Sequence, residues 1–147
     1  MICFKNFAPF SSLKESEFSI LEDLTNKKKY RKGDTILKTG QIAEDIIFLN
    51  SGIVSSVYIQ STKKFIRDFY FPPFIFTEQE SFEKKIPAKF SIICVSDISC
   101  HLMSKDDLEN AYNRIPNLKG IANNLLFTGF VNISNRLESL LLSLIHI

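Results

Sequence analysis

The residues that could perform chemistry are few and lie far apart along the chain. The three cysteines, Cys3, Cys94 and Cys100, do not match the closely spaced thiolates that hold an iron–sulfur cluster. A lone histidine in a strand pattern, such as His101, is more often structural than a metal ligand. No Ser–His–Asp grouping, phosphate-binding glycine loop or pair of catalytic carboxylates stands out. The sequence therefore predicts no catalytic residue, no metal site and no cofactor, and we do not expect an enzyme.

Two groups of charged side chains remain, and both have a structural explanation. The basic run at residues 27–32 could contact nucleic acid, but it leads directly into a strand pattern at residues 35–37. We therefore interpret it as the solvated edge of a sheet. Glu78, Glu80 and Glu83 are interpreted as part of a solvated turn, in which Glu78 alone could face a ligand.

The composition is that of one ordinary globular domain. The 147 residues are 45% hydrophobic and 23% charged, which is enough apolar material for a single core. With 18 basic and 16 acidic residues the net charge is only +2, so no strong field for nucleic acid is expected. No run approaches the roughly 20 apolar residues of a membrane span, and residues 1–10 do not resemble a secretion signal. We expect a cytoplasmic protein with reduced thiols.

The elements that must position any site change character along the chain. Residues 11–26 predict a helix, with Ser12 as its cap and Glu15 in capping-box position. Short strand patterns separated by turn residues then follow, which is typical of a β-sandwich or β-barrel. These patterns are at residues 35–37, 45–49, 53–59, 65–70, 90–95 and 100–103.

Helical spacing returns after the strands. Ser104 is a good cap for a helix that stops near Pro116, and Asp107 stands at its third position. A longer apolar helix is predicted from Pro116 onward. Its stripe includes the candidates for a dimer contact, Leu118, Ile121, Leu125, Ile133 and Leu137. Packing against the barrel and pairing with a second copy both explain this stripe.

Three glycine turns and the element order carry a resemblance to a known family. They lie in the segments Lys32-Gly33-Asp34-Thr35-Ile36-Leu37, Lys38-Thr39-Gly40 and Ile46-Ile47-Phe48-Leu49-Asn50-Ser51-Gly52. With Ser104-Lys105-Asp106-Asp107-Leu108 at the barrel exit, residues 12–141 resemble the sensory half of Crp/Fnr-type bacterial transcription regulators, and Glu80-Ser81-Phe82 resembles the Bacteroidetes variant. The resemblance implies an α+β fold: an antiparallel double-stranded β-helix or jelly-roll barrel, with an N-terminal helix and a long C-terminal dimerisation helix.

The resemblance also divides the chain. It implies a cyclic-nucleotide-binding-like sensor barrel at residues 1–115 and a dimerisation helix at residues 116–141. The helix-turn-helix domain of the family is missing, so DNA would be bound only through a further C-terminal domain. Residues 142–147 match a translated transposase-adapter sequence, and we expect them to be an artefactual tail of a truncated chain.

A ligand pocket is implied around Phe76, Thr77, Glu78, Ala88 and Lys89. In family members that bind cyclic nucleotides, a Gly-Glu pair holds the ribose and an arginine ten residues after the Glu holds the phosphate. Glu78 matches, whereas Thr77 replaces the glycine and Ala88 occupies the arginine position. Strand alternation points Lys89 to the other side of the wall. We therefore expect no tight cyclic AMP binding, and a pocket filled by Phe74, Phe76 and Phe90 or tuned to a less anionic ligand.

The predicted function is the sensor and dimerisation part of a Crp/Fnr-type DNA-binding regulator. It would be a homodimer with no membrane contact, and it could respond to an unknown small molecule. The alternative is a stand-alone module of the same fold that regulates a partner protein. A cupin-like metal-dependent enzyme on a similar barrel is a weaker alternative, because the histidine and carboxylate ligands are missing.

Overall fold

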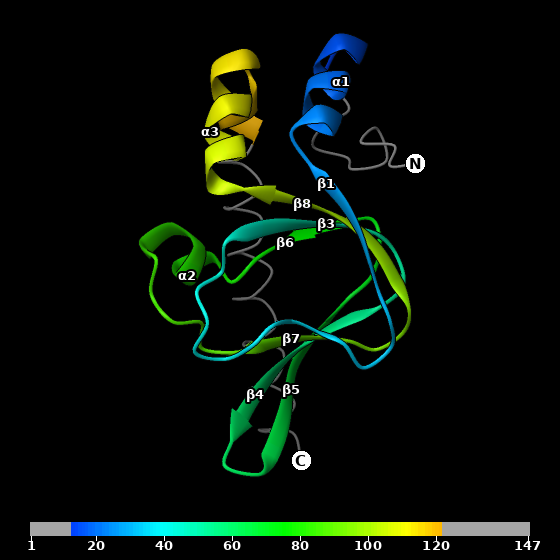
Figure 1. Cartoon of the computed structure of the whole chain (residues 1–147), viewed down its shortest axis with the longest axis vertical. Coiled ribbons are helices and arrows are strands. Elements are labelled where there is room, and N and C mark those ends of the chain that lie inside the picture. Colours follow the sequence, from blue (N-terminus) through cyan, green and yellow to red (C-terminus); the bar gives the residue numbers. More distant parts are fainter. Residues whose placement is uncertain (1–12, 122–147) are drawn as a thin grey trace, which may run out of the picture.

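Three helices and eight strands make up residues 13–121, which are the residues that the computed structural model describes (Figure 1). The helices are α1 (Glu15–Asp23), α2 (Gln79–Lys84) and α3 (Lys105–Arg114). The strands are β1 (Asn26–Tyr30), β2 (Thr35–Leu37), β3 (Asp45–Ser51), β4 (Val54–Gln60), β5 (Lys63–Tyr70), β6 (Phe74–Phe76), β7 (Ser91–Cys94) and β8 (Ile98–Ser104). Among these residues no helix combines the length and the apolar character that a membrane crossing needs.

The strands form two antiparallel sheets of four, in the orders β1-β8-β3-β6 and β2-β7-β4-β5. In the first sheet, Phe48 of β3 pairs with His101 of β8 and Ile75 of β6. In the second, Ser55 of β4 pairs with Ile93 of β7. Because most successive strands alternate between the sheets, the chain closes into a β-sandwich of jelly-roll type. The predicted fold class is confirmed, while the long C-terminal helix that belonged to it lies almost wholly outside the described residues.

Helices α1 and α3 cover one end of the sandwich and a hairpin projects from the other. Figure 1 shows α1 and α3 side by side above the first sheet, with the β4–β5 hairpin at the opposite end. Ile47 and Leu49 of β3 face the core between the sheets. Phe48, between them, packs on the opposite face with Leu21 of α1 and Ala111 of α3. Burial on both faces explains why the centre of β3 is an unbroken apolar run rather than an alternating one.

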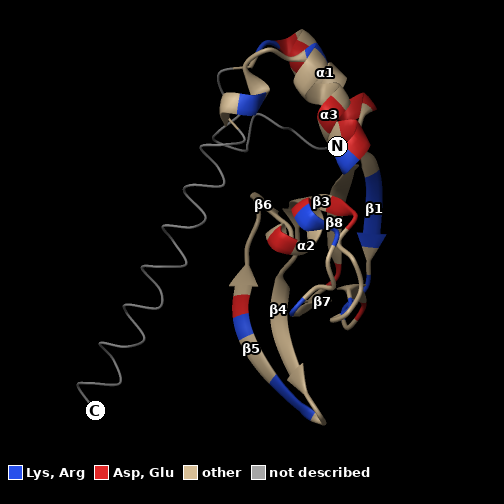
Figure 2. Cartoon of the chain, turned by 90° about the vertical axis from the view of Figure 1, so that its left-hand side faces the viewer, with Lys and Arg blue, Asp and Glu red and all other residues tan. Residues whose placement is uncertain are grey.

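The first helix is shorter than predicted, and a strand was missed after it. Lys14 is the N-cap, and its backbone N–H donates to Glu17 Oε1 at 2.9 Å, so the capping residues differ from the predicted pair. The predicted cap, Ser12, lies outside the described residues. Asn26, predicted as the helix end, instead begins β1, which pairs with β8 at the edge of the first sheet. The basic run is therefore an exposed sheet edge, as interpreted, and Figure 2 shows the basic residues along β1.

The helix that leaves the barrel was predicted correctly. Ser104 caps α3 by accepting a hydrogen bond from the Asp107 N–H at 3.2 Å, and the helix ends before Pro116. Leu118 is buried, and Ile121 is partly buried, in the cluster beneath α1 and α3. Their burial within one chain favours the packing explanation for these two positions.

The remaining dimer-helix candidates lie outside the described residues. They are Leu125, Ile133 and Leu137, and residues 142–147 lie beyond them. The division of the chain at residues 115 and 141 therefore stays a prediction.

Candidate ligand site

The β6–α2 connection carries three of the predicted pocket residues. Phe76 ends β6 and is buried in the core between the sheets. The Thr77 hydroxyl donates a hydrogen bond to the Asp45 carbonyl at 2.9 Å, which ties the connection to the start of β3. Glu78 is the N-cap of α2 and is only 6% exposed. The segment that we predicted as a solvated turn forms the helix α2, in which Glu83 is exposed and Glu80 is partly exposed. Glu78, the residue that we excepted from the solvated turn, is buried at the N-cap.

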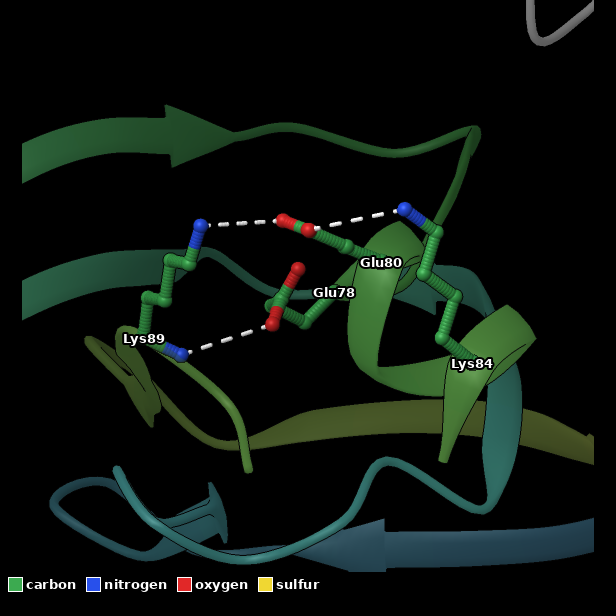
Figure 3. A network of polar contacts seen from close by, with 4 residues as sticks. All are labelled: Glu78, Glu80, Lys84 and Lys89. Atoms are coloured by element: carbon green, nitrogen blue, oxygen red, sulfur yellow. Dashed lines mark hydrogen bonds and ion pairs between the residues drawn. The ribbon is translucent and has the colours of Figure 1, made fainter. Parts of the chain in front are cut away.

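Glu78 and Lys89 are brought together, but through the lysine backbone. The Lys89 N–H donates to Glu78 Oε2 at 3.4 Å (Figure 3). The lysine Nζ lies 3.0 Å from Glu80 Oε2, and Lys84 Nζ approaches the same carboxylate at 3.8 Å. The hydrogen bond from Lys89 lowers the pKa of Glu80, and the same contact raises the pKa of Lys89. The Lys89 charge is therefore already paired at the surface.

Ala88 lies beneath the loop between β2 and β3. Its N–H donates to the Gln41 carbonyl at 2.8 Å, and its carbonyl accepts from the Gly40 N–H at 2.9 Å. The side chain is buried in the same core cluster as Phe76, Phe82 and Phe90. This position is therefore fixed by the backbone and offers a methyl group, not a cation, to any ligand.

Aromatic rings gather on the inner wall beside these residues. Tyr70 stacks on Phe76 with ring centroids 4.5 Å apart, and on Phe74 at 5.3 Å. Phe76 and Phe90 are buried, whereas Phe74 is 39% exposed at the edge. Two of the three aromatics that we expected to fill the pocket thus belong to the core between the sheets.

Sequence reasoning missed the polar side chains on the facing strands. Arg67 Nη1 donates to the Tyr70 hydroxyl at 3.2 Å, and that hydroxyl donates to Ser56 Oγ at 3.2 Å. The guanidinium also lies 4.4 Å from the centre of the Phe90 ring. The register of β4 and β5 is irregular at this point, so strand alternation could not have placed Arg67 with Tyr70.

The cysteines and the histidine of the described residues are structural in position. Cys94 of β7 and Cys100 of β8 are buried free thiols, as the sequence suggested. Burial raises the pKa of Cys94 to about 11 and that of Cys100 to about 12. Burial lowers the pKa of His101, whose Nδ1 lies 3.2 Å from Asn50 Oδ1. Residues 13–121 contain no group of three or more His, Cys, Asp or Glu side chains that could hold a metal ion.

Known proteins of the same architecture extend these observations. The catabolite activator protein of Thermus thermophilus superposes with a TM-score of 0.76 at 17% identity, over 90% of this chain and 62% of that one. The sensor domain of the transcriptional regulator DNR from Pseudomonas aeruginosa gives 0.70 at 15% identity, over 92% and 89% of the two chains. The regulatory domain of Toxoplasma gondii PKA, solved with cAMP, gives 0.59 at 18% identity, over 73% and 39%.

At these identities the structural matches establish the fold alone. This chain spans less than two thirds of the length of the Thermus protein. No curated protein sequence is significantly similar to it. The family model described as "Cyclic nucleotide-binding domain" matches residues 27–114, from β1 to the end of α3. The chain therefore belongs to the family of cyclic nucleotide-binding domains, and its fold is the one found in the sensor domains of Crp/Fnr-type transcription regulators.

Proposed function

We propose that this chain is the ligand-sensing and dimerising part of a cytoplasmic Crp/Fnr-type transcription regulator. The observation that carries the proposal is the exit from the barrel, where β8 runs directly into α3 and the apolar chain continues past it. A ligand that alters the barrel can shift α3 and whatever follows it, since α3 packs with α1 on the first sheet. Such coupling is a change of population between two states and needs no chemistry.

Dimerisation is assigned to residues 116–141, with residues 1–115 as the sensor. The contacts would come from Leu125, Ile133 and Leu137 of two copies, since Leu118 and Ile121 pack within one chain. The β4–β5 hairpin supports pairing of two copies in general, because it exposes large apolar side chains, and extended apolar surfaces mark protein contacts. These side chains are Tyr58, Ile59, Phe65, Ile66 and Phe69, with exposed fractions from 38 to 62%. Light scattering should give twice the 16.9 kDa mass of one chain.

Cyclic AMP is not the ligand of this pocket. The anion of a cyclic nucleotide would face Ala88, and the neighbouring Lys89 ammonium is held by Glu80. An anion left unpaired on desolvation costs several kcal/mol. Calorimetry should therefore detect no binding of cyclic AMP, and an affinity in the millimolar range or tighter would contradict this assignment.

The proposed role includes DNA binding. The test is to clone the native reading frame, purify its product and select genomic fragments that it retains. The product should retain fragments with an inverted repeat, because a symmetric dimer reads two half-sites. The 147-residue chain is the control and should retain none. If the native product retains no specific fragment but co-purifies with one protein, the alternative of a module that regulates a partner is correct.

A further inference from the structure

Arg67 stands at an irregular point of β5. Ser56 of β4 pairs with Asp68, whereas the next residue, Val57, pairs with Ile66, so Arg67 is the extra residue of a β-bulge. In a regular strand, side chains three residues apart lie on opposite faces. A bulge re-aims a side chain, and Arg67 here reaches the hydroxyl of Tyr70, three residues on. The bulge therefore turns a cation toward the buried face of the strand.

The surroundings hold the guanidinium in one place. It lies over the ring of Phe90, which belongs to the core between the sheets. Tyr70, which accepts from it, is 8% exposed and is itself anchored to the fully buried Ser56 hydroxyl at 3.2 Å. A planar cation stacked on a ring keeps its N–H edge available for an oxyanion. Arg67 is thus preorganised on the face of β5 that meets Phe90, the residue that follows Ala88 and Lys89 in the chain.

Arg67 forms no close ion pair within the described part of the chain. Within residues 13–121 no carboxylate lies within 4.0 Å of the Arg67 guanidinium, whereas the Glu80 carboxylate pairs with Lys84 and Lys89. The adjacent Asp68 directs Oδ1 to the Phe69 N–H at 2.7 Å. Tyr70 uses one of the five N–H donors of the arginine. A half-buried cation without a counter-ion is costly, and a ligand anion would compensate for it.

We propose that Arg67 is an anion-binding residue of the pocket, and that the ligand is a small organic molecule whose carboxylate or phosphate group pairs with this guanidinium. The inference rests on the proposed ligand-sensing function and adds the chemical class of the ligand. The anion would be held from β5 and would need no cation at position 88. Bidentate hydrogen bonds to the free edge of Arg67 supply the recognition.

The test uses inorganic phosphate as the probe and the arginine side chain as the reporter. Phosphate is titrated into the ¹⁵N-labelled chain at constant ionic strength, with chloride as the exchanged anion. We expect the Nε–Hε resonance of Arg67 to shift and saturate. In Arg67→Gln the affinity for phosphate should fall about 10-fold or more, the loss of a charge-assisted pair.

Lys64→Gln is the matched control, because it removes the same charge from an exposed position of the same strand. It should bind phosphate as the unaltered chain does. If Arg67→Gln does not fold, Arg67→Lys replaces it and should weaken binding by losing the bidentate geometry. The proposal is overturned if the Arg67 signal does not saturate, if Arg67→Gln binds within twofold of the unaltered chain, or if the shifts are confined to the surroundings of Lys89.

These outcomes are independent of the regulatory role. A regulator that binds DNA but shows no phosphate response at Arg67 would refute the anion site and leave the proposed function intact. A saturable response at Arg67 in a protein that retains no DNA would support the anion site and refute the proposed DNA-binding function.

Discussion

Gly52, in the turn between β3 and β4, should be among the least replaceable residues of the described barrel. Its φ is +88°, where an alanine costs about 1 to 2 kcal/mol. A Cβ added there would overlap the Asp97 carbonyl oxygen and lie 2.6 Å from Ile98 Cγ2 and 2.9 Å from Ile98 Cα. Two of these atoms are backbone, so the turn before β8 must move, and overpacking of this kind costs about 1 to 3 kcal/mol more. Gly52→Ala should therefore destabilise the fold by about 2 to 5 kcal/mol.

Gly33 provides a matched control, since its φ is +89° but an added Cβ would meet nothing within 4 Å. Gly33→Ala should cost only the backbone strain, about 1 to 2 kcal/mol. The gain from a stiffer unfolded chain is common to both variants and cancels in their difference. Urea unfolding followed by circular dichroism suits a chain without tryptophan. A difference of about 1 kcal/mol moves the midpoint by roughly 0.3 to 1 M. Equal midpoints for Gly52→Ala and Gly33→Ala would refute the steric reasoning.

Three further predictions concern the thiols, a helix cap and the surface ion pair. Cys94 should be alkylated at least about 100-fold more slowly in the native protein than in the urea-unfolded protein, because its pKa of about 11 lies two units above the usual 9.0. Cys100, with a pKa of about 12, should react more slowly still. Equal alkylation rates of native and unfolded protein, measured by mass spectrometry, would contradict the burial of these thiols. Ser104→Ala should destabilise the fold by about 1 kcal/mol, because it removes the acceptor at the start of α3; an unchanged urea midpoint would argue against the cap. Lys89→Gln should raise the pKa of Glu80 toward its ordinary value, as followed by ¹³C NMR of the carboxylate; a constant pKa would show that the pair does not form in solution.

Turn chemistry is the part of this fold that could be predicted from the sequence. Glycines, which tolerate positive φ, and the Ser104 cap are local signals, and they placed most strand ends within a few residues. β1 and β6 lack such signals. β1 is almost wholly polar, and its strand conformation comes from pairing Lys28 with Cys100, 72 residues away. β6 has three residues after two prolines, too few for an alternation to be visible.

The sequence predicted the residues of the candidate site only where their spacing along the chain matched the family pattern. The match at Glu78 and the missing cation at Ala88 follow from linear spacing along the chain. The position of Arg67 depends on a bulge that shifts the pairing of two strands by one residue. A one-residue shift in a strand exchanges its faces, so no pattern within β5 alone could place this side chain beside Tyr70 and Phe90.

The lysines of β1 affect how the protein behaves at high concentration. β1 is the outermost strand of the first sheet, and its free N–H and C=O groups could pair with the same edge of another molecule. Such pairing would bring Lys27, Lys28 and Lys29 of two chains within about 5 Å of each other. The repulsion of these ammonium groups discourages growth of a continuous sheet between molecules. The run that first suggested nucleic acid thus protects the barrel against edge-to-edge aggregation.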